Sequence, residues 1–89
     1  MSPEQSRAAR AWLGWSQGQL AARGNVSVNS VRSFEGGIKA VHRNTIAALQ
    51  QAIEAAGIRL VFDRNGLAAG IVRREADVDL TLGPSNSSN

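Results

Sequence analysis

The sequence has no cysteine, no tyrosine and one histidine among 89 residues, and aromatic residues make up only 4% of it. Without cysteine the chain can form neither a disulfide nor a thiolate metal site, and a single histidine completes no metal-binding set. No segment approaches the roughly 20 apolar residues that span a bilayer, and residues 1–10 lack the apolar run of a secretory signal. We therefore expect a cytoplasmic protein with no metal, no other cofactor and no membrane partner.

Groups that could perform catalysis are also scarce. Residues 1–74 contain four acidic residues and one histidine, and their serines fall mainly where helices are predicted to begin. No Gly-rich phosphate-binding loop follows a predicted strand. Because no nucleophile, base and orienting group can be named together, we expect no catalytic residues and no enzymatic activity.

Basic residues are concentrated in residues 1–74. This stretch holds all ten basic residues and only four of the seven acidic residues, so it carries a net charge of +6, whereas the whole chain carries +3. A basic body followed by an acidic segment suits a polyanionic partner. Chance asymmetry on a solvated surface explains the charge distribution equally well, so charge alone does not decide the function.

Four helices are predicted, followed by a β-hairpin. Serine caps and glycine or asparagine stops delimit the first three, at residues 2–14, 16–25 and 27–37, and Asn44 is expected to cap a fourth that continues to Ala56. Apolar residues at helical spacing predict the buried sides of these helices: Ala8, Ala9, Trp12 and Leu13; Leu20 and Ala21; Val31 and Phe34; Ile46, Leu49 and Ile53. The expected fold class is mainly α, a four- to five-helix bundle with a C-terminal β-hairpin.

The hairpin is predicted from two β-rich segments, residues 58–63 and 70–74, joined by the turn signal Arg64-Asn65-Gly66. An isolated hairpin is marginal in water and exposes unpaired edges. We therefore expect a homodimer whose interface includes Leu60, Phe62, Ile71 and Val72, and we expect Trp12 to pack on the hairpin or on the second copy. Residues 1–57 and 58–74 then form the helical part and the dimerisation element.

Residues 75–89 have a composition of their own. They are acidic and end in GPSNSSN, which is typical of a flexible tail, but Val78, Leu80 and Leu82 alternate with polar residues as in a strand. This segment is a candidate binding site for a partner protein.

Residues 17–37, QGQLAARGNVSVNSVRSFEGG, have the organisation of a helix-turn-helix unit. Two short helical patterns meet at the corner Gly24-Asn25, where asparagine can adopt the left-handed conformation. From Ser27 to Ser33 the second of these helices carries no acidic residue, as close contact with phosphates would require. Such a unit places its second helix in the major groove of DNA.

With these features, the chain resembles the phage-repressor (XRE, Cro-type) helix-turn-helix family. The resemblance covers residues 5–57 and depends on the joint spacing of Arg10, Gly14-Trp15-Ser16-Gln17, Leu20-Ala21, Val26-Ser27, Val31, Phe34-Glu35, Gly37 and the helix at Asn44. It implies a repressor-like bundle, double-stranded DNA as the partner, and a role as a transcriptional regulator. Two copies would bind a palindromic operator, and the regulator is expected to act as a repressor.

The resemblance, together with side-chain chemistry, also indicates site residues. Base contacts are expected from Val28, Asn29, Arg32 and Ser33, and phosphate contacts from Ser16, Gln17, Ser27, Lys39 and Arg43. Asn29 can bind adenine, Arg32 can bind guanine or a phosphate, and Val28 can touch a thymine methyl group. The alternative is that these residues merely face solvent. Arg10 and Glu35 match a pair that forms an internal salt bridge; two separate solvated charges are the alternative.

The sequence departs from the family pattern at three positions. Asn25 stands where glycine is usual, and Gly24 stands where a bulkier residue is common, so we expect a looser corner. Gly36 replaces a residue that is frequently polar or basic, which removes one expected phosphate contact.

Two functions remain in competition. The leading hypothesis is a sequence-specific DNA-binding regulator, associated with the nucleoid through its operator. The alternative is a protein-interaction module of the same fold, an antitoxin or an antiactivator.

Overall fold

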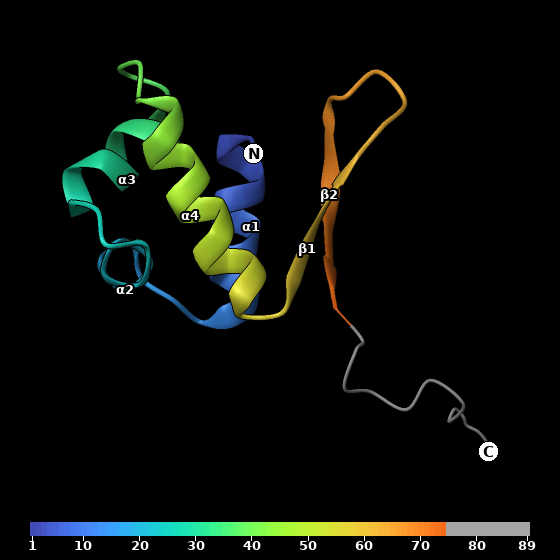
Figure 1. The fold of residues 1–89 in the computed structure, drawn as a ribbon, viewed down its shortest axis with the longest axis horizontal. Helices are drawn as coiled ribbons and strands as arrows, with labels where there is room; N and C mark the ends of the chain where they lie inside the picture. Colours follow the sequence, from blue (N-terminus) through green and yellow to red (C-terminus); the bar gives the residue numbers. More distant parts are fainter. Residues whose placement is uncertain (75–89) are drawn as a thin grey trace.

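The computed structural model describes residues 1–74, in which four helices precede a two-stranded antiparallel hairpin (Figure 1). The elements are α1 (Pro3–Leu13), α2 (Gln17–Gly24), α3 (Val28–Gly36), α4 (Arg43–Ala55), β1 (Ile58–Phe62) and β2 (Ala68–Arg73). Helices α2 and α3 lie on one side of α4, and the hairpin lies on the other side, beside α1 and α4 (Figure 1). The predicted fold class and order of elements are confirmed. The tail and the alternating pattern predicted beyond residue 74 lie outside the described residues.

Local capping explains where the first three helices begin and end. Each is preceded by a serine whose hydroxyl accepts a hydrogen bond from the backbone N–H three residues later: Ser2, Ser16 and Ser27. Each is followed by a residue with left-handed backbone dihedrals, at φ values of 70°, 56° and 66°: Gly14, Asn25 and Gly37. These boundaries depend on neighbouring residues only, and the predictions for them are confirmed.

The start of α4 differs from the prediction. The helix begins at Arg43, and His42 occupies the N-cap position without a side-chain cap, so Asn44 lies inside the first turn. Val41 and Ile46 occupy the two positions of a hydrophobic staple, and both pack against the core. Burial of these two apolar side chains, and not a polar cap, therefore sets the point at which the chain enters α4.

One buried cluster holds the helices and the hairpin together. It comprises Ala9, Leu20, Ala21, Val31, Phe34, Leu49, Ile53, Ile58 and Leu60. Most of the predicted buried positions are confirmed, but the buried side of α1 includes fewer residues than predicted. Ala9 is completely buried, whereas Ala8 is exposed and 63% of the surface of Trp12 is exposed. Trp12 therefore does not pack closely on the hairpin of its own chain.

The hairpin contains an irregularity close to its turn. Leu60 pairs with Ile71 and Val61 with Gly70, but Phe62 pairs with Ala68, so the register shifts between Val61 and Phe62. Strand β2 begins at Ala68, two residues earlier than predicted. The reason is a compact turn in which the Asp63 carboxylate accepts hydrogen bonds from two backbone N–H groups, those of Asn65 at 2.8 Å and Leu67 at 3.0 Å.

The four residues expected at the dimer interface lie in two different environments. Leu60 is buried in the core and Ile71 packs against it, because this face of the hairpin covers the helices of the same chain. These two side chains therefore stabilise the fold of one chain instead of facing outward. Phe62 and Val72, by contrast, remain 43% and 39% exposed.

Gly24, at the end of α2, lies close to α4. A Cβ atom added to Gly24 would lie 3.2 Å from the Leu49 side chain and 3.5 Å from the carbonyl oxygen of Ala48. Gly24 thus allows α2 and α4 to approach closely, and Asn25 makes the left-handed turn that follows. Helix α4 fills the space that a side chain at Gly24 would take, whereas the looser α2–α3 corner expected from the sequence stays a prediction.

Candidate nucleic-acid interface

Helix α3 has a buried side and an exposed side with different chemistry. Val31 is completely buried, and Phe34 and Glu35 are nearly so, at 8% and 5% exposure of the whole residue. On the opposite side Asn29 and Arg32 are exposed. The one acidic residue of this helix therefore points into the protein, and its solvent-facing surface presents an amide and a guanidinium group. A surface of this kind can approach a polyanion without carboxylate–phosphate repulsion.

The other two expected base-contacting residues are less accessible. Val28 and Ser33 are half-buried, and Val28 packs against the core cluster. They flank the exposed pair, so that they can support a contact at the edge of the interface. Asn29 and Arg32 are the two residues of α3 with exposed polar side chains.

Asn29 and Arg32 are hydrogen-bonded to each other. The Nη1 atom of Arg32 donates to Oδ1 of Asn29 at 3.0 Å. The two residues are three positions apart, so they are neighbours on the helix surface. The bond orients the Asn29 amide, with its oxygen toward Arg32 and its NH₂ group free to donate elsewhere. The sequence indicated the two residues as separate base readers, but did not indicate this pairing.

A hollow of about 200 Å³ separates α3 from the loop that follows it. Its lining brings together α3, the loop and the first turn of α4: Asn29, Ser30, Ser33, Lys39, Ala40, Val41, His42 and Thr45. Lys39 thus lies beside the same face of α3 that carries Asn29, and the exposed Arg43 begins the next helix. Of the two predicted basic contacts, Lys39 is therefore placed beside the exposed surface of α3, and Arg43 lies in the chain between His42 and Thr45, two residues that line the hollow.

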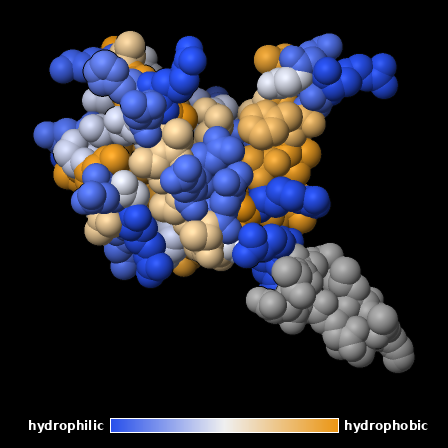
Figure 2. Space-filling view, in the orientation of Figure 1, coloured by the Kyte–Doolittle hydropathy of each residue, from blue (hydrophilic) through white to orange (hydrophobic). Residues whose placement is uncertain are grey.

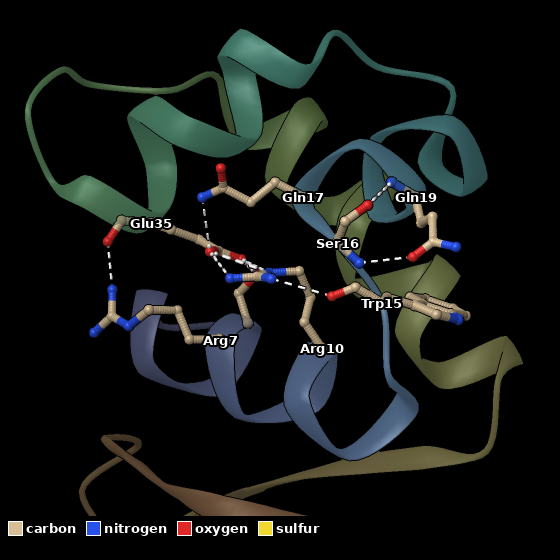
Figure 3. Close-up of polar contacts among 8 residues, drawn as sticks. Arg7, Arg10, Trp15, Ser16, Gln17, Gln19 and Glu35 are labelled. Carbon is tan, nitrogen blue, oxygen red and sulfur yellow. Dashed lines mark hydrogen bonds and ion pairs between the residues drawn. The ribbon is translucent and has the colours of Figure 1, made fainter.

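At the beginning of α2, Ser16 caps the helix as predicted, but Gln17 does not face outward. Ser16 caps the helix through its hydroxyl, and its own N–H donates to Oε1 of Gln19 at 2.8 Å (Figure 3). Gln17, expected to bind a phosphate, instead turns inward, and its Nε2 donates to Oε1 of Glu35 at 3.2 Å. Because one hydrogen of the Gln17 amide is used on Glu35 and the side chain is turned inward, the backbone N–H groups of the first turn are the donors that face an anion here.

Glu35 is the centre of a hydrogen-bond network that joins three helices (Figure 3). Its carboxylate accepts from the Arg10 guanidinium at 2.8 Å and 2.9 Å and from the Ser6 hydroxyl at 2.6 Å, in addition to Gln17. Arg10 also donates to the carbonyl oxygen of Trp15 at 3.1 Å. The pairing of Arg10 with Glu35 is thus present in the structure, and it ties the C-terminal half of α3 to α1 and to the start of α2.

The backbone of this residue takes part as well. Arg7 donates to the carbonyl oxygen of Glu35, from a position one turn before Arg10 on α1 (Figure 3). Two arginines of α1 therefore hold the same residue of α3, one through its carboxylate and one through its main chain.

This environment lowers the pKa of the Glu35 carboxyl group. Burial alone would raise the pKa of the Glu35 carboxyl, but hydrogen bonds from Arg10, Ser6 and Gln17, with the charge of Arg10, outweigh burial and hold the pKa below its ordinary value. Glu35 therefore remains ionised at neutral pH.

We expect acid to weaken the fold through this group. The pKa of Glu35 is lower in the folded chain than in the unfolded chain. The ionised carboxylate therefore contributes its full stabilisation of the fold above the ordinary glutamate pKa of 4.5, and this stabilisation is lost as the pH falls below that value. One proton contributes a slope of at most about 1.4 kcal/mol per pH unit. Urea denaturation between pH 7 and pH 3 measures this slope. The variant Glu35→Gln should show a flatter profile, and an identical slope in both proteins would contradict the expectation.

Sequence reasoning missed two buried polar residues of α1. Gln5 and Ser6 are 2% and 0% exposed; Ser6 binds Glu35, and Gln5 binds the hairpin. The capping pattern in the sequence predicted the contact of Gln5 with Ser2, but not its contacts with the hairpin. A signal was present, because Gln5 lies four residues before the buried Ala9 and Ser6 lies four residues before Arg10, so both fall on inward-facing sides of the helix.

Comparison with protein-family models gave no match, and comparison with curated proteins gave none either. None of the helices formed by residues 1–74 is long and apolar enough to cross a membrane. A function for this chain must therefore be inferred from the arrangement of its own residues.

Proposed function

We propose that this protein is a sequence-specific double-stranded DNA-binding transcriptional regulator of the phage-repressor type, and that it acts as a dimeric repressor. In this proposal α3 lies in the major groove and reads base edges through Asn29 and Arg32. The proposed regulator catalyses no reaction and needs no cofactor.

One observation carries this proposal. The solvent-facing side of α3 displays Asn29 and Arg32, while the single carboxylate of the helix is turned inward and held by Arg10. Maintaining a buried ion pair contributes little net stability compared with apolar packing. Its presence here is explained if the outer surface of α3 must be free of negative charge and the helix must be held in one position.

The basic residues beside α3 support the same function. Lys39 lines the hollow next to α3 and Arg43 is exposed at the start of α4. A helix in the major groove is flanked by the phosphates of both strands, so cations at this position can bind the backbone while α3 contacts the bases.

The dimer is proposed from the exposed surface of the hairpin. Figure 2 shows apolar residues gathered over the hairpin and bordered by hydrophilic residues. Among the large apolar residues that are exposed, Phe62 belongs to β1, Val72 to β2 and Trp12 to α1. Within residues 1–74 the sheet has only two strands, so each strand has one unpaired edge. A second copy would cover these groups and place two α3 helices on successive turns of one face of DNA.

Selection of bound duplexes from a random library tests the regulator function. We expect a palindromic consensus whose half-site centres are about 10–10.5 base pairs apart. A protein that retains no duplex at low ionic strength, or that retains all duplexes equally, would contradict sequence-specific binding. Sedimentation without DNA tests the dimer: a monomer at micromolar concentration would contradict it, and would leave the exposed apolar residues to a different protein, as in the interaction-module alternative.

We expect the variants Lys39→Ala and Arg43→Ala to weaken binding of all DNA sequences alike. Each leaves one phosphate per half-site without its cation, so the slope of log K against log salt should become shallower by about 0.9 for each such phosphate. Binding titrations at several salt concentrations measure this slope.

The variant Arg23→Ala is the control for these substitutions. Arg23 is also an exposed arginine, but it lines a hollow with Ala52 and Ala56, at the opposite end of α4 from Arg43. Its removal should leave the salt dependence unchanged. An equal change of slope in all three variants would mean that the basic residues act through overall charge and not through contacts beside α3.

A further inference from the structure

Gln5 connects the hairpin to the helical part of the protein. Its Nε2 atom donates to the carbonyl oxygen of Val61 at 2.9 Å and to that of Gly70 at 3.0 Å, while its Oε1 accepts from the backbone N–H of Ser2 at 3.0 Å. The side chain is 2% exposed, and both of its amide hydrogens are used. One buried carboxamide thus binds both strands of the hairpin and the first turn of α1.

These contacts occur where the hairpin is irregular. The two carbonyl groups belong to a cross-strand pair, and the register shifts immediately after Val61. Phe62, an exposed residue of the proposed dimer surface, follows directly, and Val72 lies two residues beyond Gly70. Gln5 therefore holds the part of the hairpin that carries the proposed dimer contacts.

The neighbouring residue on α1 is bound to the other side of the molecule. Ser6 donates to the Glu35 carboxylate of α3 at 2.6 Å, and Arg10 binds the same carboxylate. Two adjacent buried residues of α1 thus bind opposite sides of the molecule, Gln5 the hairpin and Ser6 the Glu35 carboxylate of α3. Among residues 1–74 the hairpin is otherwise attached by apolar packing of Ile58, Leu60 and Ile71 and by the link through Gly57. Apolar packing is non-directional, so it restrains the orientation of the hairpin less than hydrogen bonds do.

We propose that Gln5 is a positioning residue that sets the distance and angle between the two α3 helices of the dimer, and thereby the half-site spacing that the protein accepts. This inference rests on the proposed function, because it requires a dimer formed through the hairpin and bound to DNA through α3. Each added base pair rotates one half-site by roughly 35° relative to the other. A rigid dimer must therefore discriminate sharply between spacers that differ by a single base pair.

The chain provides a matched pair of variants. Gln5 and Gln19 occupy the same position of two capping boxes, but Gln19 is exposed and, among residues 1–74, its side chain bonds only within its cap. The variant Gln5→Leu removes the side-chain hydrogen bond of its capping box and the hairpin contacts, whereas Gln19→Leu removes the equivalent capping bond alone; both leave the serine cap in place. Binding is measured on a duplex with one selected half-site, and on palindromes whose spacer is optimal, one base pair shorter, or one or two base pairs longer.

We expect Gln5→Leu to bind the single half-site as the natural chain does, because α3 itself is unchanged. On the optimal palindrome its affinity should fall about 10-fold, since a loosened hairpin lowers the effective concentration of the second α3 helix. Its affinity for the other spacers should change little, so the preference among spacers becomes flat. Gln19→Leu should keep the preference of the natural chain. Sedimentation should show that both variants remain dimers.

Several results would overturn this role of Gln5. They are an unchanged spacer preference in Gln5→Leu, a proportional loss on the half-site and the palindrome, and a natural chain that binds DNA without any spacer preference. A natural chain that binds no duplex at all would instead contradict the proposed function itself. If circular dichroism shows that Gln5→Leu does not fold, Gln5→Asn replaces it. That variant keeps the amide but is one methylene too short to reach both carbonyl groups, and it should flatten the preference in the same way.

Discussion

Replacing Arg10 with alanine is expected to lower the free energy of unfolding by about 3–5 kcal/mol, the usual cost of removing one partner of a buried ion pair. Arg10 is the only cation that binds the Glu35 carboxylate among residues 1–74, and the Glu35 side chain is only 2% exposed. Without Arg10 the carboxylate keeps two neutral donors, Ser6 and Gln17. A loss of this size is a large share of the stability of a small domain, which is about 5–15 kcal/mol in total.

Urea denaturation followed by tryptophan fluorescence measures this effect, at one fixed protein concentration because a dimer gains stability as its concentration rises. Arg7→Ala is the control on the same helix. The Arg7 side chain is 47% exposed and binds only the main chain of Glu35 and, at 3.9 Å, the exposed Glu4, so its removal should cost less than about 1 kcal/mol. Equal effects of the two substitutions would contradict a central role for the carboxylate pair.

A double variant separates stability from position. Replacing the pair by apolar residues, as in Arg10→Met with Glu35→Leu, removes the need to solvate a buried charge and should recover most of the lost stability. We nevertheless expect weaker DNA binding by this variant, because directional hydrogen bonds no longer hold the C-terminal half of α3. Recovery of both stability and DNA affinity would show that the pair is not required to position the helix.

The second large effect is expected at the surface of α3. Asn29→Ala and Arg32→Ala should each weaken binding to the selected operator by about 1–3 kcal/mol per half-site, which corresponds to about 5- to 150-fold. Each substitution should also relax the preference at one base position, adenine for Asn29 and guanine for Arg32. Affinities for operators with single base changes measure both the loss and the relaxation.

The two substitutions should not be additive. Arg32 donates to the Asn29 oxygen in the free protein, so loss of either residue also changes the orientation of the other. We therefore expect the double variant to lose less than the sum of the single variants. Gln51→Ala, at an exposed position of α4, is the control and should change nothing. Equal losses on every DNA sequence would contradict base reading and would assign both residues to phosphate contacts.

Features that depend on near neighbours could be predicted from the order of residue types. The serine caps, the left-handed Asn25 and Gly37, and the spacing of Leu49 and Ile53 involve residues within one or two turns. Their energetics are local, so the pattern of residue types was sufficient to predict the order of the elements and the exposure of Asn29 and Arg32, though not the partial burial of Val28 and Ser33. The approximate position of the hairpin followed in the same way from β-rich segments and a turn signal.

The surroundings of individual side chains, by contrast, depend on how distant segments pack. Gln17 binds Glu35 instead of facing outward, and Leu60 packs in the core of its own chain. Gly24 allows α4 to lie close to α2. The carboxamide of Gln5 finds its partners 56 and 65 residues away. The same local sequence pattern is compatible with a side chain that faces solvent and with one that faces the protein interior. The choice is made only when remote parts of the chain come together and each buried donor, acceptor and apolar surface must find a partner.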